Sequence, residues 1–304
     1  MSYAAAILLT ISAFMHASWN FISKRRNPSL AFFSITSATA ATVMSPFLVI
    51  HRNVLLQMPI SLWRFVLATG LAQMVYFLGL AGAYRNGNIS LAYPLARSLP
   101  VLFVSAISLI LGHKSDIGTL GLFGMALITM GCIILPFPRF QKMRWREYVD
   151  IVYLMALVAA IGTTGYTLID DLALAQLRAG FSGQLAAYEI TLFYIAMQAT
   201  STAVMIGIGT LLYRPERRQL KHILRNPTQV FSGLVTGLVI MATYGLVLAS
   251  MAYVTNVSYV AAFRQLSIPI GAVLGLTLQG EPRYLPKLLG IGIVSLGLVL
   301  VGIG

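Results

Sequence analysis

Charge and cysteine are both scarce in this sequence. Asp, Glu, Lys and Arg make up 10% of the 304 residues, whereas a typical soluble domain carries about 25%. The single cysteine, Cys132, lies inside an apolar segment, so we expect neither a disulfide nor a cysteine metal site. Paired catalytic acids, a Walker phosphate loop and zinc-ligand spacings are also missing, and no cofactor is expected.

Apolar residues dominate what is present. They account for 58% of the chain, and the mean hydropathy is +0.82. A chain of this length has no core large enough to bury that much apolar surface, so its solvent must be lipid. The first apolar segment has no basic region before it and many others follow, which argues against a cleaved signal peptide. We expect an all-α, multi-pass integral membrane protein, with a bacterial inner membrane favoured.

An apolar helix of about twenty residues crosses the hydrocarbon core of a bilayer. Segments of roughly that length, nearly all of them uncharged, predict ten transmembrane helices. Their expected ranges are 1–23, 27–50, 65–84, 86–112, 117–135, 151–169, 190–213, two helices within 226–280, and 288–304. Turn-forming residues lie in the links between them, for example Asn27-Pro28 and Asn226-Pro227.

The formal net charge of +13 would suggest nucleic-acid binding in a soluble protein. Here the basic residues crowd into the short links, and we expect no nucleic-acid partner. Fifteen Lys and Arg residues lie in the odd-numbered links and four in the even-numbered ones. Because cytoplasmic loops are enriched in Lys and Arg, we expect the odd links in the cytoplasm and both termini outside.

Weak internal similarity relates the two halves of the chain. At an offset of 168 residues, Asn88-Ile89-Ser90 matches Asn256-Val257-Ser258, and Arg97 and Arg264 lie 167 residues apart. At an offset of 166, two glycines match two others: Gly124 and Gly131 with Gly290 and Gly297. We infer two five-helix repeats, 1–140 and 148–304. An odd number of helices per repeat makes the repeats inverted, with a site at their interface.

Several segments resemble a known family. Gly79–Tyr84 running into Ala92–Pro100 resembles the hallmark region of the EamA family of the drug/metabolite transporter (DMT) superfamily. Met15–Asn20, Tyr166–Asp170 and Arg264–Ser267 are similar to a subgroup of that family. The resemblance covers nearly the whole chain and implies a DMT-like fold that transports metabolites or drugs. Relatives mostly have cytoplasmic termini, whereas the distribution of basic residues in this chain predicts external ones. We follow the distribution of basic residues.

Two positions depart from the family pattern. Relatives often have Glu where this chain has Gln265, and the Gly-Glu pair kept as Gly280-Glu281 becomes Gly112-His113 in the first half. The first change argues against proton coupling by a carboxylate at position 265.

Arg97 and Arg264 are the main candidates for substrate binding. Each lies near the middle of an apolar segment, where a charge costs roughly 2.5–3.5 kcal/mol on insertion scales. One interpretation is that they bind an anionic group of the substrate, for which the planar guanidinium is well suited. The alternative is that they bond to carbonyls or carboxylates and only hold helices together.

Polar side chains spaced at helical intervals are further candidates. Ser12, His16 and Asn20 share one face of the first helix, with Trp19 beside them. They either line a cavity or form hydrogen bonds between helices. Other candidates for the lining, by the same reasoning or from the resemblance, are Thr69, Gln73, Tyr76, Tyr93, Tyr166, Thr236, Thr243, Tyr244 and Gln265.

Acidic residues are few within the predicted helices. Glu189 is a candidate for proton coupling, for pairing with an Arg, or for a position at the membrane interface. Asp170 and Asp171 follow the predicted helix 151–169, and we expect them to face water.

These features favour a secondary transporter of a small organic metabolite with a carboxylate, phosphate or phosphonate group, not an enzyme. Efflux of cationic drugs is the alternative, and it requires a midspan acid. A lipid-carrier flippase subunit or a membrane-embedded enzyme is disfavoured, because no clustered acids or metal ligands are visible. The expected partners are the bilayer and the substrate. Oligomerisation stays open.

Overall fold

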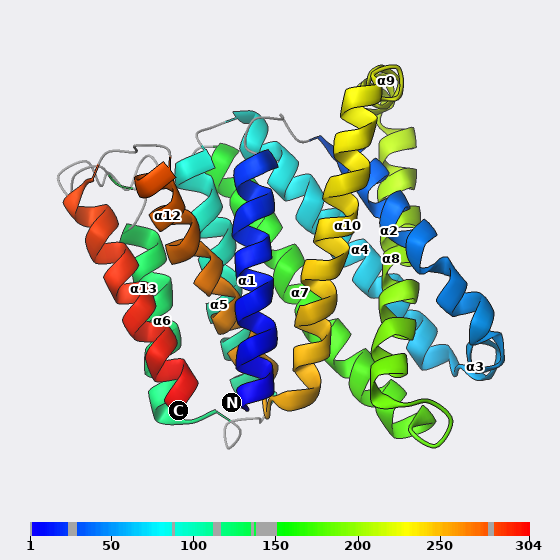
Figure 1. Cartoon of the computed structure of the whole chain (residues 1–304), viewed down its shortest axis with the longest axis horizontal. Coiled ribbons are helices and arrows are strands. Elements are labelled where there is room, and N and C mark those ends of the chain that lie inside the picture. The colour runs from blue at the N-terminus through cyan, green and yellow to red at the C-terminus, as the bar shows by residue number, and fades with distance from the viewer. Residues whose placement is uncertain are drawn as a thin grey trace.

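The computed structural model describes residues 2–23, 29–86, 89–111, 117–134, 137, 151–278 and 283–304, and every regular element in them is helical. The elements are α1 Tyr3–Ser23, α2 Leu30–Ile50, α3 Arg52–Gln57, α4 Ile60–Asn86, α5 Ile89–Ile110, α6 Thr119–Ile134, α7 Ile151–Phe181, α8 Ala187–Leu212, α9 Arg214–Leu224, α10 Pro227–Ser250, η4 Met251–Tyr253, α11 Val257–Phe263, η5 Arg264–Leu266, α12 Ser267–Leu278 and α13 Leu285–Ile303. The long helices form one bundle, with both termini at one end and α9 at the other (Figure 1).

Seven helices in the described part are long and apolar enough to cross a membrane, namely Leu30–Ile50, Ile60–Ala83, Ile151–Phe181, Ala187–Leu212, Pro227–Tyr253, Val257–Leu274 and Leu285–Ile303. Three shorter apolar helices are Tyr3–Ser18, Ala96–Ile110 and Thr119–Ile134. Large apolar side chains such as Phe14, Phe123 and Leu296 are more than half exposed, as expected where lipid replaces water. The all-α membrane class is confirmed. The count of ten spans and the inverted repeat stay predictions.

Local sequence explains where several helices begin. The Asn226 side chain accepts hydrogen bonds from the backbone nitrogens of Thr228 and Gln229, and Pro227 follows at the first helical position of α10. Asn256 caps α11 in the same way through the nitrogen of Ser258, at 2.8 Å. The turn residues seen in the sequence therefore serve as helix caps.

The predicted end of the helix 151–169 is wrong. Helix α7 continues to Phe181 without interruption. Residues 172–179 are mostly Ala and Leu, which favour helix, and Ala173, Leu174 and Leu177 are completely buried in the core. Continued apolar periodicity outweighs the two aspartates, which by themselves predict a helix end.

Two short helices occupy links in which none was predicted, α3 and the basic helix α9. Glu216 anchors α9 to the bundle. One of its carboxylate oxygens accepts a hydrogen bond from the backbone nitrogen of Ala31 at 2.9 Å, and the other pairs with Arg85 at 2.6 Å. Helix α9 is thereby held against the first turn of α2 and the last turn of α4.

Backbone-to-backbone packing joins α6 and α13, which lie side by side at one flank of the bundle, on the left in Figure 1. A Cβ atom added at Gly124 would lie 2.6 Å from the carbonyl oxygen of Gly297, and one added at Gly297 would lie 2.6 Å from that of Gly124. Only glycine permits this approach, and small residues let membrane helices pack closely.

Candidate functional site

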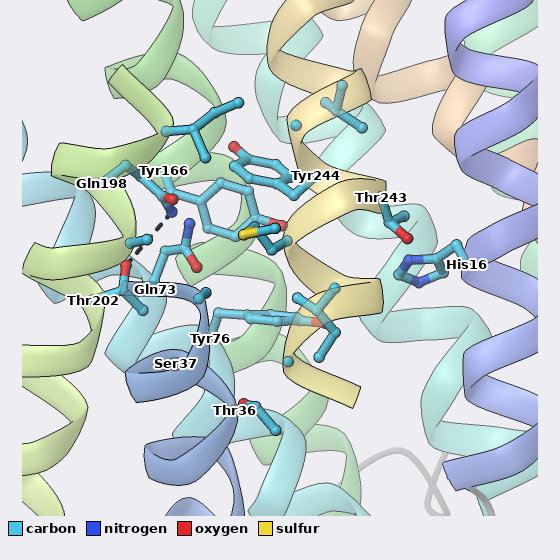
Figure 2. A pocket seen from close by; sticks show the side chains of 18 of the residues that line it. His16, Thr36, Ser37, Gln73, Tyr76, Tyr166, Gln198, Thr202, Thr243 and Tyr244 are labelled. Carbon is cyan, nitrogen blue, oxygen red and sulfur yellow. Dashed lines mark hydrogen bonds between the residues drawn. The ribbon is translucent and has the colours of Figure 1, made fainter. Parts of the chain in front are cut away.

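A cavity lies at the centre of the bundle, between helices from both halves of the chain. Side chains from α1, α2, α4, α5, α7, α8, α10 and η5 reach it. Figure 2 shows tyrosine, glutamine and hydroxyl groups gathered around it. Its polar lining consists of Ser12, His16, Thr36, Ser37, Gln73, Tyr76, Arg97, Tyr166, Gln198, Thr202, Thr243, Tyr244 and Arg264.

Arg264 lies among tyrosines at the cavity wall. Its guanidinium carbon is 5.6 Å from the ring centre of Tyr166 and 5.5 Å from that of Tyr244. One terminal nitrogen donates to the Tyr166 hydroxyl at 2.9 Å, and the other is 3.4 Å from the Thr167 hydroxyl. The tyrosine rings therefore stabilise the cation by cation–π contact and hydrogen bonding. Its partners in these contacts are neutral side chains.

The three aromatic side chains form a continuous wall. The Tyr166 ring packs edge-to-face on Tyr244, with centroids 5.3 Å apart, and on Tyr76, with centroids 5.8 Å apart. These rings come from α4, α7 and α10, which span both halves of the chain. Edge-to-face contacts are a favourable arrangement of aromatic rings, and together the three rings present apolar surface to the cavity.

Arg97 makes the hydrogen bonds expected of an arginine that holds helices together. A terminal nitrogen donates to the backbone carbonyl of Arg264 at 3.0 Å and to the Ser267 hydroxyl at 2.9 Å. It thus ties α5 to the point where α11 changes through η5 into α12. Arg97 also lines the cavity, so its structural contacts leave it within reach of a substrate.

Asp170 does not face water, contrary to expectation. Its side chain is 0% exposed, because α7 continues past it into the core. The hydroxyls of Thr69 and Tyr194 donate to Oδ1 at 2.5 and 2.6 Å, and that of Tyr244 donates to Oδ2 at 2.5 Å. A buried acid therefore lies directly behind one wall of the cavity.

His16 and Gln73 lie at the cavity, as the sequence predicts for cavity-lining residues. Figure 2 shows His16 pointing from α1 toward α10, where Thr243 is its neighbour. Ser12 also links these helices, donating to the backbone carbonyl of Thr243 at 2.8 Å. The same face of α1 therefore lines the cavity and forms a hydrogen bond to α10, so both roles predicted for it are present.

Other predicted residues lie elsewhere. The Gln265 amide, in η5, donates to the carbonyl of Ala261 on α11 and is buried away from the cavity lining. Glu189 lies at the start of α8, where its carboxylate accepts a hydrogen bond from the backbone nitrogen of Ala186 at 2.8 Å. Thr69 reaches Asp170, and Thr236 is buried outside the lining. The side chains of Trp19, Asn20 and Tyr93 lie outside the described part.

Sequence reasoning missed Asp170, Tyr194 and the pair Gln198 and Thr202. Gln198 donates to the Thr202 hydroxyl at 3.5 Å from one turn away on α8. Their spacing of four residues is the signal that singled out the polar face of the first helix, and applying it to α8 would have found them. No local signal distinguishes Tyr194 from a packed tyrosine.

Within the described ranges, no group of three or more His, Cys, Asp or Glu side chains is placed to hold a metal ion. No protein-family model and no curated protein matches the chain. A solved structure, described as "Crystal structure of protein", superposes with a TM-score of 0.69 at 13% sequence identity, over 100% of this chain and 98% of that one. This similarity covers the whole fold and says nothing of function.

Proposed function

We propose that this protein is a secondary transporter that binds a small organic anion in the central cavity and exposes it alternately to the two sides of the membrane. One observation carries the proposal. Two guanidiniums, Arg97 and Arg264, line a cavity within an apolar bundle, and no Asp or Glu is among the described residues that line it. A cavity with this charge attracts a carboxylate, phosphate or phosphonate group and repels cations.

The aromatic wall favours a substrate with an apolar or planar part next to its anionic group. Tyr76, Tyr166 and Tyr244 present ring surface, while Gln73, Gln198 and the hydroxyls offer hydrogen bonds. Pockets that combine ring surface with a few placed polar groups suit small molecules. The anionic group would bind at Arg264 and the rest of the substrate against the tyrosines.

Helix contacts support an arrangement in two exchangeable halves, 1–140 and 148–304. If the long helices of the two halves are paired in chain order, α1 corresponds to α7, α2 to α8, α4 to α10 and α6 to α13. The contact between α1 and α10 then corresponds to the contact between α7 and α4. The contact of α4 with α8 becomes that of α10 with α2, while α2–α8 and α6–α13 map onto themselves. This pattern is expected of inverted repeats around a shared site, and it supports relationship to the EamA family.

Efflux of cations is the competing function, and Asp170 is the one observation that favours it. A drug-efflux mechanism needs a buried acid, and Asp170 is one. However, its two oxygens accept hydrogen bonds from three hydroxyls and it stands behind Tyr244 rather than in the lining. We therefore favour the anion.

Thermal stability of the purified protein with four ligands built on one ring tests the charge preference. We expect benzoate and benzenesulfonate to raise the melting temperature, because a ligand that binds only the folded state stabilises it. Benzylamine and benzyl alcohol should have no effect. Arg264→Gln should weaken anion binding about tenfold or more, because a hydrogen bond to a charged group contributes about 1.5–3 kcal/mol.

Arg217→Gln is the matched control. Arg217 is exposed on α9, so this substitution makes the same change of charge outside the cavity. It should bind the anions as the natural protein does. Stabilisation by benzylamine alone, retained in Arg97→Gln and Arg264→Gln, would overturn the proposal in favour of cation efflux.

A further inference from the structure

Asp170 is a buried acid whose presence is not explained by anion binding at the two arginines. It is completely buried on α7, and its hydrogen-bond donors come from three other helices: Thr69 on α4, Tyr194 on α8 and Tyr244 on α10. Three donated hydrogen bonds fit an ionised carboxylate, which only accepts. A charge in the bilayer interior is costly, so an ionisable side chain at this place is a candidate for a functional role.

Tyr244 connects this carboxylate to the cavity. Its hydroxyl donates to Oδ2 of Asp170 at 2.5 Å, its ring lines the cavity, and the Arg264 guanidinium lies over that ring at 5.5 Å. The other donors, Thr69 and Tyr194, both act on Oδ1 and are absent from the described lining. Tyr244 is therefore the one Asp170 donor that a substrate at Arg264 would touch.

Charge balance changes when an anion enters. Before an anion binds, the positive charge of Arg264 acts on Asp170, and Tyr244 contacts both residues. The other charged or titratable side chains around the two residues are His16 on α1, Tyr76 on α4, Arg97 on α5, Tyr166 on α7 and Tyr194 on α8. On α7 itself, Asp171 follows Asp170, and its charge acts on Arg178. An anion bound at Arg264 places a second negative charge beside the buried carboxylate. A nearby like charge disfavours the ionised form of a carboxyl group, so the bound anion favours protonation of Asp170.

We propose that Asp170 is the coupling group of the transporter and that a proton binds to its Oδ2 when an anion binds at Arg264. The inference rests on the proposed function. Among the described residues, Oδ2 has one hydrogen-bond donor and Oδ1 has two, so Oδ2 gains the proton, which comes from the aqueous phase. The Asp170 hydroxyl then donates to the Tyr244 oxygen. The hydrogen of Tyr244 turns into the cavity and donates to the anion, so one proton and one anion enter together.

Calorimetry measures this proton directly. Benzoate and benzenesulfonate are titrated into the purified protein at neutral pH, in Tris and in triethanolamine, because the difference in heat between the buffers counts the protons exchanged. Both probes stay fully ionised near neutral pH, so any proton is taken up by the protein. We expect uptake of about one proton per bound anion.

Matched variants identify the residue that takes up the proton. Asp170→Asn should bind the anion without proton uptake, while Glu189→Gln, the same change of acid to amide at the start of α8, should keep the uptake. Tyr244→Phe keeps the ring under Arg264 and removes the hydroxyl. It should bind about tenfold more weakly and lose most of the uptake. If Asp170→Asn does not fold, Tyr244→Phe carries the test.

The outcomes separate this inference from the proposed function. Anion binding with no proton uptake, or uptake that Tyr244→Phe and Asp170→Asn leave intact, overturns the coupling role and leaves the anion transporter standing. Uptake lost in Glu189→Gln would assign coupling to Glu189 instead. Failure of both anions to bind would overturn the anion site itself.

Discussion

Arg97 and Arg264 have different surroundings, although they lie at nearly matching places, 167 residues apart, in the two halves of the sequence. Arg97 donates to the carbonyl of Arg264 and to Ser267, whereas Arg264 lies between tyrosine rings. The first set of contacts holds helices together, and the second leaves a cation at the cavity wall. The structural interpretation therefore describes Arg97 better, and the substrate-binding interpretation describes Arg264 better.

We expect this difference to appear in stability. Arg97→Gln removes hydrogen bonds between α5 and the start of α12, and we expect it to lower the unfolding free energy by about 1–3 kcal/mol. A double-mutant cycle with Ser267→Ala should give a coupling energy of about 1 kcal/mol, because the two side chains are in direct contact. Arg264→Ala paired with Ser267→Ala is the control, and no coupling through a side-chain hydrogen bond is expected there. Equal coupling in both cycles would contradict the assignment.

At the scale of elements, the sequence predicted where helices lie better than where they end or break. Apolar length alone located most spans, since lipid demands about twenty apolar residues. It failed at Asp170, where the helix continues, and it did not predict η5, the 3-10 turn at Arg264. Pro269 shortly after that turn provides no backbone N–H for a helical hydrogen bond, which weakens the helix before it.

The contact between α6 and α13 gives a test of packing at this scale. We expect Gly297→Ala to lower the melting temperature, because the added Cβ would lie 2.6 Å from the backbone oxygen of Gly124. Gly292→Ala on the same helix is the matched control, since no described atom lies within 4 Å of its added Cβ. It should leave stability unchanged or raise it by up to about 1 kcal/mol, because alanine favours helix over glycine. A similar loss for both variants would show that helix propensity, not contact, decides the outcome.

For the whole molecule, orientation in the membrane follows from the distribution of charge. Both termini lie at the end of the bundle opposite α9 (Figure 1). Four of the basic residues counted in the odd links lie on α9: Arg214, Arg217, Arg218 and Lys221. The more basic end of the bundle should remain in the cytoplasm.

We therefore expect a reporter fused after Gly304 to read as external and a thiol at Gln219→Cys, on α9, to react only from the cytoplasmic side. The background for thiol labelling is low, because the single natural cysteine, Cys132, is buried. A cytoplasmic signal from the fusion, with external labelling at position 219, would reverse the assignment.

Composition and spacing were enough to predict an all-α membrane protein, the approximate positions of its helices and most of the aromatic and basic groups of the site. They were enough because these properties depend on local composition: apolar length sets a span, and a charge within a span is conspicuous. Tertiary structure alone decided the surroundings of those groups. That Arg264 lies over Tyr166 and Tyr244, and that Asp170 lies behind Tyr244, depends on contacts among α4, α7, α8, α10 and η5. No local pattern encodes such contacts, because they join residues up to about a hundred positions apart and arise only when the helices pack.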